Sequence, residues 1–263
     1  ISKILNTKII TRSNSAPVGW SKNSFKSNLY KILISLADDV MVNSLEFKKS
    51  FQQQFNIKPK CIYNPFDKDF IRSKLKKKKI IKFFKKGHIN LVSVGRLTNQ
   101  KDHLTLLKSI KLMDINFKVK LIIIGKGENK RILQNYIERN KLQNKIKLLG
   151  YLDNPYHYIK ESDIVIQTSK YEGLPNILLE AQFLKKYIIS TNCISGPTEI
   201  LLSGKAGDLI KVGDYKKLSL LIRNYKRNKQ IINKKINEGV KKFNRFDYKI
   251  NCKKYLNFVN KNF

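Results

Sequence analysis

The sequence is poor in cysteine, histidine and acidic residues, and these shortages exclude several classes of protein. It holds three cysteines, Cys61, Cys193 and Cys252, and three histidines among 263 residues. No cysteines show CxxC spacing and the histidines are scattered, which argues against a disulfide framework or a zinc site. No apolar run reaches the roughly 18 residues of a membrane-spanning helix. The sequence therefore predicts a protein with reduced thiols that does not span a membrane.

Acidic residues are so few that the formal charge is +35, with 54 Lys and Arg against 19 Asp and Glu. The excess gathers in residues 72–87, which hold nine cations and no acid, and in the tail after residue 215. Such a segment can be solvated, can bind an anionic membrane surface or can bind nucleic acid. Lysine far outnumbers arginine and no nucleic-acid-binding motif is present, so we expect no nucleic-acid partner.

From residue 88 onward, short apolar runs alternate with segments of helical spacing. The expected strands are 89–95, 118–125, 145–151, 163–169, 187–192 and 206–212, and the expected helices are 102–113, 129–140, 155–162, 176–186 and 197–204. Several strands are continuous runs of Ile, Val and Leu, which is typical of parallel strands covered by helices on both faces. The pattern predicts an α/β fold with a Rossmann-like, doubly wound parallel sheet.

The chain is expected to divide into four parts. Residues 1–67 repeat the alternation in a shorter form, with strands at 7–14 and 40–44 and helices at 28–39 and 45–56. Residues 58–67 are expected to be a strand that leads into a turn at Asn64-Pro65. The other parts are a basic linker over 68–87, the complete α/β domain over 88–215 and C-terminal helices over 216–263 that pack back on the body. Three strands and two helices are few for a domain, so the first part is interpreted as a partial one.

Charged residues lie where the strands of the 88–215 domain end. Arg96 and Lys101 follow one strand and can converge on one anion, as a diphosphate requires. Glu172 lies in the turn after another strand, and Glu180 lies inside the next helix, where a carboxylate can accept two hydroxyl groups of a ribose. Ligands of open α/β sheets bind at this edge. Taken singly, these charges also suit an ordinary solvated surface.

Together the motifs resemble those of one family. They are Gly95-Arg96 with Lys101, Gly125-x-Gly127, Leu149-Gly150-Tyr151, the stretch S-x-Y-E-G-x-P-x-x-x-L-E-A at 169–181, and SGPTEIL at 195–201. This set resembles the donor-binding half of retaining glycosyltransferases with the GT-B fold, glycosyltransferase family 4 or group 1. The resemblance covers 88–215 and extends more weakly through 12–14, 37–44 and 62–67.

The resemblance implies a role for each matching residue. Arg96 and Lys101 match the cations on the donor diphosphate, where they stabilise the leaving group. Glu180 matches the acid that holds the ribose hydroxyls, and Glu172 matches the acid near the donor sugar. Further substrate-binding positions implied in this way are Gly95, Gly150, Tyr151, Leu152, Gly173, Leu174 and Asn176, with residues 150–152 beside the nucleobase.

The resemblance also implies the chemistry. A hexose or N-acetylhexosamine would pass from a nucleotide sugar, with UDP the expected nucleotide, to a glycan or a polyprenyl-diphosphate-linked acceptor in polysaccharide or lipopolysaccharide synthesis. Transfer would retain the anomeric configuration and need no protein nucleophile, cofactor or metal, and the sequence has no DxD motif. The expected location is the cytoplasm, at the inner membrane face, with the basic segments on anionic lipid.

The sequence departs from the family at its start. The first strands, the glycine-rich loop and the histidine of the family's N-terminal domain have no counterpart in residues 1–67, so the start of that domain is expected to be lacking. Arg12 and Asn14 are expected to line the cleft, and the 263-residue chain is expected to bind donor but transfer sugar poorly. The alternatives are a donor-binding remnant or partner subunit, a GT-B epimerase and a polyanion-binding protein.

Overall fold

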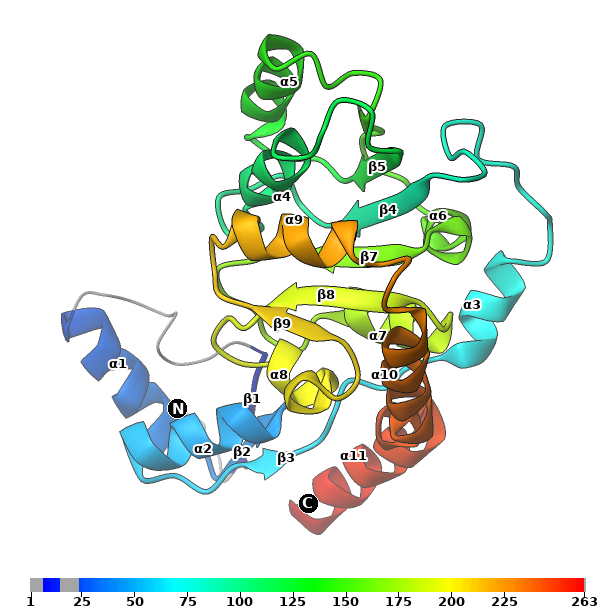
Figure 1. Cartoon of the computed structure of the whole chain (residues 1–263). Helices are drawn as coiled ribbons and strands as arrows, with labels where there is room; N and C mark the ends of the chain where they lie inside the picture. The colour runs from blue at the N-terminus through cyan, green and yellow to red at the C-terminus, as the bar shows by residue number, and fades with distance from the viewer. Residues whose placement is uncertain (1–6, 15–23, 263) are drawn as a thin grey trace.

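The computed structural model describes residues 7–14 and 24–262, and its strands form two parallel sheets (Figure 1). The small sheet has the order β1-β2-β3, and the large sheet has the order β6-β5-β4-β7-β8-β9. The strands of the large sheet are β4 (Ile89–Val94), β5 (Val119–Ile124), β6 (Ile146–Leu148), β7 (Ile164–Gln167), β8 (Tyr187–Thr191) and β9 (Asp208–Ile210). All six strands expected beyond residue 88 are present, although several are shorter than expected.

Helices cover both faces of the large sheet. They are α4 (His103–Lys111), α5 (Lys130–Arg139), α6 (Tyr156–Glu161), α7 (Asn176–Phe183), α8 (Pro197–Ile200) and α9 (Tyr215–Arg223). Leu91 and Ile123 pack in one core cluster with residues of α4, α5 and α9. Their neighbours Val92 and Ile122 pack in a second cluster, with residues of α6 and α7. Because successive side chains of a strand face opposite ways, this division confirms the doubly wound sheet.

The N-terminal unit consists of β1 (Ile10–Ser13), α1 (Ser24–Ser35), β2 (Asp39–Val42), α2 (Leu45–Phe55) and β3 (Lys60–Cys61). The Ser44 hydroxyl caps α2 by accepting the Phe47 N–H at 3.1 Å. The expected helix over 28–39 was wrong in its bounds, because β2 begins at Asp39. In the segment 58–67, expected to be a strand leading into a turn at Asn64-Pro65, the strand β3 is short, because only Lys60 and Cys61 pair with β2.

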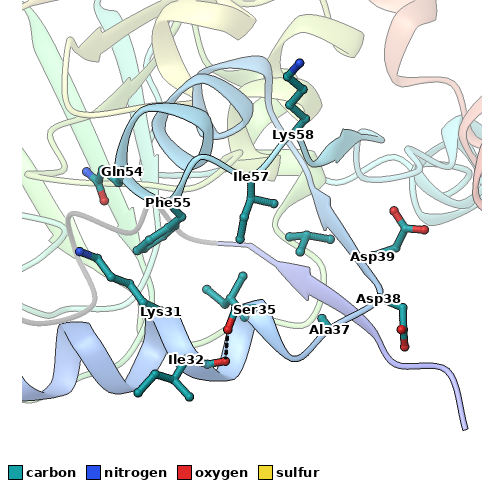
Figure 2. A pocket seen from close by; sticks show the side chains of 12 residues that line it. Lys31, Ile32, Ser35, Ala37, Asp38, Asp39, Gln54, Phe55, Ile57 and Lys58 are labelled. Carbon is teal, nitrogen blue, oxygen red and sulfur yellow. Dashed lines mark hydrogen bonds between the residues drawn. The ribbon is translucent and has the colours of Figure 1, made fainter. Parts of the chain in front are cut away.

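A hollow of about 600 Å³ opens between α1, α2 and the start of β2 in this unit (Figure 2). Lys31 and Ile32 line it from α1, Phe55 lines it from the end of α2, and Asp38 and Asp39 lie at its far side. The hollow therefore belongs to the N-terminal unit alone, away from the large sheet.

The basic segment 68–87 is more ordered than a free linker. It begins with α3 (Lys68–Lys74), which the Asp67 carboxylate caps by accepting two backbone N–H groups. Ile71 and Ile81 are buried in the second core cluster of the large sheet. Two apolar anchors thus hold this segment against the body, and most of its lysines remain outside.

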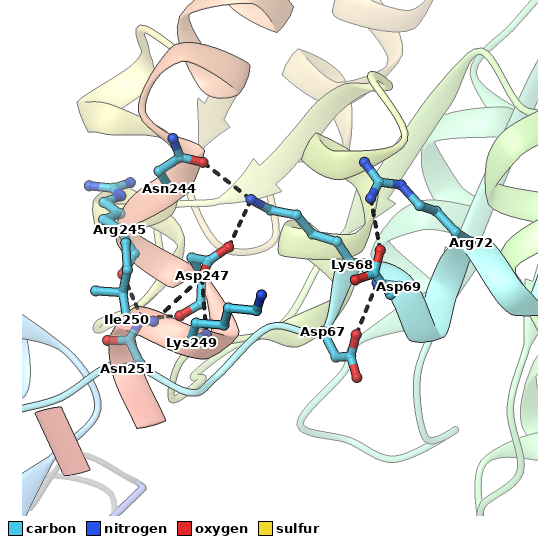
Figure 3. A network of polar contacts seen from close by, with 10 residues as sticks. All are labelled: Asp67, Lys68, Asp69, Arg72, Asn244, Arg245, Asp247, Lys249, Ile250 and Asn251. Atoms are coloured by element: carbon cyan, nitrogen blue, oxygen red, sulfur yellow. Dashed lines mark hydrogen bonds and ion pairs between the residues drawn. The ribbon is translucent and has the colours of Figure 1, made fainter. Parts of the chain in front are cut away.

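The C-terminal tail comprises α10 (Lys229–Lys241), a 3₁₀ turn (Phe243–Phe246) and α11 (Tyr248–Asn262). The Lys68 ammonium of α3 lies 3.0 Å from the Asp247 carboxylate and 3.2 Å from the Asn244 amide oxygen (Figure 3). Both partners of the ion pair are about three-quarters buried. On α11, the Tyr255 ring lies 5.5 Å from the Arg12 guanidinium of β1. The tail therefore contacts both the basic segment and the N-terminal unit.

Within the described residues, none of the helices combines the length and the apolar character that a crossing of the bilayer demands.

Candidate active site

The large sheet reverses its strand order between β4 and β7, and this point locates the candidate site. From β4 the chain adds strands in one direction through β5 and β6, and then returns to the other side with β7. The helices that follow these two strands, α4 and α7, lie on opposite faces of the sheet, and such a switch point is where α/β sheets bind ligands. Arg96 and Lys101 lie in the first loop, and Glu172 lies in the second.

Glycines allow the loops after β4 and β5 to touch through their backbones. Gly125 and Gly127 both have φ values that favour glycine, at 154° and 158°. A Cβ atom on Gly125 would collide with the Gly95 carbonyl oxygen, and one on Gly127 would collide with the backbone of Leu97. The GxG pattern thus allows the backbones of the two loops to approach closely, and this contact helps to position the segment after Gly95.

Lys101 and Glu172 form an ion pair across the switch point. Their nitrogen and oxygen atoms lie 2.5 Å apart, with side-chain exposures of 18% and 8%. The two loops are also joined by the Gln100 amide, which donates to the Tyr171 carbonyl at 2.9 Å. The Thr168 hydroxyl donates to the Asp102 carbonyl at 2.9 Å. The sequence assigned Lys101 and Glu172 to different parts of a ligand, and the structure brings them into direct contact.

Two further titratable side chains near this pair differ in exposure, because Arg96 is exposed and His103 is buried. Arg96 is exposed, and its guanidinium donates to the Gln100 side-chain oxygen at 3.4 Å. His103 opens α4 and is buried, and burial followed by the charge of Lys101 lowers its pKa to about 4. His103 is therefore neutral at neutral pH. The cations in these two loops are then Arg96 and Lys101 after β4 and the exposed Lys170 after β7.

Glu180 lies in the middle of α7, and its carboxyl group is more buried than that of an acidic residue on the surface of a helix. Burial raises its pKa from an ordinary 4.5 to about 7. The nearby Tyr156 of α6 has its pKa raised to about 12, first by burial and then by the charge of Glu180. A carboxylate that loses its solvation in this way gains much from hydroxyl donors that a ligand brings. This environment distinguishes Glu180 from a solvated helix residue.

The other predicted binding residues have mixed environments. The Gly150 carbonyl accepts the Gly125 N–H at 2.8 Å, which ties the loop after β6 to the loop after β5. Tyr151 is 62% exposed, with the Lys126 ammonium 5.3 Å from the centre of its ring. Leu152 is partly buried and packs on the second core cluster. Leu174 is buried in that cluster, so only its backbone can meet a ligand.

Gly173 and Asn176 meet the N-terminal unit. A Cβ atom on Gly173 would collide with the Asn14 carbonyl oxygen, so these two backbones are in close contact. The Asn64 amide donates to the Asn176 side-chain oxygen at 3.4 Å. Arg12, expected to line the cleft, donates to the Asn64 side chain at 2.8 Å. The loop after β7 is therefore flanked by the N-terminal unit as well as by the large sheet.

Sequence reasoning missed two carboxylates at this boundary. Glu46, in the first turn of α2, accepts the Gly196 N–H at 2.9 Å. Glu199, in α8, accepts the Leu45 N–H at 2.9 Å and the Tyr63 hydroxyl. Glu199 stood in the SGPTEIL motif without an assigned role. Glu46 carried no sequence signal beyond the acidic first turn of a helix.

Metal ligands do not gather at the candidate site: across residues 7–14 and 24–262, no group of three or more His, Cys, Asp or Glu side chains is placed to hold an ion. The predicted site residues also take no part in lining the hollow between α1 and α2. The arrangement instead offers several cations, one paired acid and one desolvated acid at the edge where the parallel strands end.

A smaller parallel sheet beside a Rossmann-like sheet of this strand order is the architecture of GT-B glycosyltransferases. The structure superimposes on HepE of Anabaena, solved with UDP-glucose, with a TM-score of 0.82 at 20% identity, covering 99% of this chain and 74% of that one. It also matches a glycosyltransferase of Rickettsia africae, with a TM-score of 0.81 at 19% identity, over 98% of this chain and 71% of that one. The fold is therefore of the GT-B type.

The sequence pattern of the family described as glycosyl transferases group 1 matches residues 74–243. An uncharacterized glycosyltransferase of Methanocaldococcus jannaschii, MJ1059, is 34% identical over 86% of this chain and 61% of its own length. The chain belongs to this family. A relative in Campylobacter jejuni is named as an N-acetylgalactosaminyltransferase acting on a diphospho-undecaprenol-linked sugar, and is 30% identical over 78% of this chain and 56% of its own length. The chain thus spans about three-fifths of the length of these relatives.

Proposed function

We propose that the chain is the donor-binding part of a retaining glycosyltransferase of family 4, which transfers a hexose or N-acetylhexosamine from a UDP-sugar. The observation that carries the proposal is the pairing of Lys101 with Glu172 at the switch point, with Arg96 beside it. The solved complex of HepE with UDP-glucose supports a UDP-sugar donor. The name of the Campylobacter relative supports an acceptor linked to polyprenyl diphosphate. The name of a Staphylococcus aureus relative, capsular polysaccharide biosynthesis glycosyltransferase CapH, supports a role in polysaccharide synthesis.

In this proposal the residues divide the donor between them. Arg96 and Lys101 bind the diphosphate and stabilise the charge that grows on it as the glycosidic bond breaks. Glu180 accepts the ribose hydroxyls, and residues 150–152 lie beside the base. Glu172 stabilises the electron-poor sugar, and its contact with Lys101 keeps the leaving group and the sugar in register. The leaving phosphate accepts the proton of the acceptor hydroxyl on the same face, which accounts for retention, and the cations take the place of a metal ion.

The proposal predicts selective stabilisation of the purified chain by one nucleoside diphosphate. Thermal unfolding is measured with UDP, GDP and ADP, and UDP at 100 times its dissociation constant is expected to add about 2.7 kcal/mol of stability. Glu180→Ala and Arg96→Ala are expected to abolish the shift. A chain that melts cooperatively but responds to none of the three nucleotides would instead support a remnant without a formed donor site.

The basic segment 68–87 is proposed to hold the enzyme on the cytoplasmic face of an anionic membrane. Its lysines surround Ile80, which is 82% exposed, and each cation near such a surface contributes about 1 kcal/mol. The chain is expected to sediment with phosphatidylglycerol vesicles at low salt, and to be released when Lys76, Lys77, Lys78 and Lys79 are changed to Gln. Equal sedimentation with neutral phosphatidylcholine vesicles would contradict this part of the proposal.

A further inference from the structure

Two carboxylates join the N-terminal unit to the large sheet by exchanging hydrogen bonds between two helix starts. Glu46 of α2 accepts the Gly196 N–H, which immediately precedes α8, at 2.9 Å. Glu199 of α8 accepts the N–H of Leu45, the first residue of α2, also at 2.9 Å. We call this reciprocal pair of contacts the Glu46–Glu199 clasp. Each acid therefore satisfies a backbone donor that the opposite helix leaves open.

The segment that Glu46 holds lies directly on the loop of Glu172. The Ser195 hydroxyl donates to the Glu172 carbonyl at 3.0 Å, and Ile194 forms a β-bridge with Tyr171. A Cβ atom on Gly196 would collide with the Gly173 carbonyl oxygen. Residues 194–196 and 171–173 are thus packed backbone against backbone. A displacement of the first segment must displace the second.

This supporting segment is held in a strained shape. Ser195 and Gly196 are consecutive residues at positive φ, 62° and 83°. The left-handed conformation costs a residue such as serine about 1 kcal/mol or more, so the segment keeps this shape only where other contacts hold it. Glu46 supplies such a contact, and it comes from outside the large sheet.

The Glu46–Glu199 clasp places Glu46 in an environment that disfavours its negative charge. The pKa of Glu46 is raised, first by burial and further by the charge of Glu199, while the Gly196 N–H acts in the opposite direction. Two acids that share a partly buried boundary repel each other. The contribution of the clasp therefore lies in where it places the backbone, and not in a large gain of stability.

We propose that Glu46, which the N-terminal unit contributes, is a positioning residue for the donor site. It fixes Glu172 by holding residues 195–196 against the backbone of residues 172–173. Because Glu172 is paired with Lys101, the same contact sets the place of the ammonium that meets the diphosphate. The inference rests on the proposed function, since it assigns the Lys101–Glu172 pair to a nucleotide-sugar donor. It adds that the donor site is completed by a residue of the opposite unit.

The test compares Glu46→Ala with Glu46→Gln, and uses Glu138→Ala, on the exposed side of α5, as the control. Amide hydrogen exchange of peptides covering 192–201 and 170–176 is measured on the full chain without ligand. Removal of the acceptor in Glu46→Ala is expected to raise exchange in both peptides about tenfold and to weaken UDP binding about threefold to tenfold. Glu46→Gln keeps an acceptor oxygen and is expected to stay within twofold of the unchanged chain in both measurements.

Unchanged exchange at 192–201 in Glu46→Ala would overturn the clasp. Raised exchange at 192–201 with no change at 170–176, or with unchanged UDP affinity, would overturn the positioning role. A Glu46→Gln variant as impaired as Glu46→Ala would also overturn it, since the role requires only an acceptor. If the unchanged chain does not bind UDP, the proposed function fails, and the exchange measurements still decide whether Glu46 holds the loop of Glu172.

Discussion

Lys101→Ala is expected to weaken UDP binding by about 100-fold, which corresponds to about 2.8 kcal/mol. The change removes an ammonium that meets the diphosphate, and it leaves Glu172, with a side chain only 8% exposed, as an unpaired carboxylate. Loss of one partner of a buried ion pair is far more costly than loss of an exposed pair, because the remaining charge keeps its desolvation without compensation. Isothermal titration calorimetry with UDP measures the loss, and thermal unfolding without ligand measures the change in stability.

Two further variants separate these effects. Lys111→Ala removes an exposed cation at the end of α4 and is expected to bind UDP within twofold of the unchanged chain. The double variant Lys101→Ala, Glu172→Gln removes both charges, so it is expected to regain most of the lost stability while UDP binding stays weak. If Lys101→Ala alone bound UDP as tightly as the unchanged chain, the assignment of Lys101 to the diphosphate would be wrong.

The fold beyond residue 88 could be predicted because its signal is local. Continuous Ile, Val and Leu runs such as Leu121–Ile124 are short, regular and separated by helices of ordinary length, and each became a buried strand. The bounds were less accurate where tertiary contacts decide them. The helix expected to reach residue 39 stops at Ser35, because Asp39 pairs with Ile10 of β1, and such a pairing has no local sequence signal.

The sequence proposed a set of candidate site residues, but it could not propose the contacts among them. The motifs identified Lys101 and Glu172 separately, yet their ion pair depends on how the loops after β4 and β7 meet across 71 positions of sequence. Gln100 and Thr168, which join those loops, carry no chemistry that a sequence pattern could single out. The contact of Glu46 with Gly196 spans 150 positions. Partners at such separations are chosen by the packing of two units, which no single segment encodes.

The basic segment 68–87 also shows a difference between what its composition predicts and what its packing decides. Composition indicated a solvated linker, and its lysines do lie largely outside. However, Ile71 and Ile81 are spaced ten positions apart within the charged run, and both insert into the core beside α6 and α7. A single apolar residue among many charges gives little periodicity, although burial of one such side chain contributes about 1.5 to 3 kcal/mol. Ile71 and Ile81, together with the partly buried Leu75, Phe83 and Phe84, therefore hold against the core a segment whose average composition favours solvent.

Glu180→Gln is expected to raise the stability of the free protein while lowering its affinity for UDP. Burial raises the pKa of Glu180 to about 7, above its ordinary 4.5, so the folded state binds the proton more tightly than the unfolded state. Stability linked to this group is therefore fully present below about pH 4.5 and is lost as the pH rises through 7. At pH 8 the variant avoids that loss, and we expect a gain of about 1 to 3 kcal/mol in the free energy of unfolding. Denaturant unfolding at pH 8 and pH 4 measures the gain, which should nearly vanish at the lower pH, where the carboxyl group is protonated in the folded state and mostly protonated in the unfolded state.

Binding is expected to respond in the opposite direction. The ionised carboxylate can accept both ribose hydroxyls, whereas the protonated form gives up an acceptor position to its own proton. Affinity for UDP is therefore expected to fall about tenfold between pH 8 and pH 6, as Glu180 takes up a proton. The terminal phosphate of UDP also titrates at about pH 6. This titration affects binding to Glu180→Gln and to the unchanged chain equally, so the difference between the two proteins reports the carboxyl group.

Glu138→Gln, on the exposed side of α5, is the control and should keep the pH response of the unchanged chain. Parallel pH profiles for Glu180→Gln and the unchanged chain would show that Glu180 does not meet the ribose. If the profiles differ as expected, the free protein would be most stable with Glu180 neutral and would bind UDP most tightly with Glu180 charged. Keeping a carboxylate at this position would therefore favour donor binding and lower the free energy of unfolding at neutral pH.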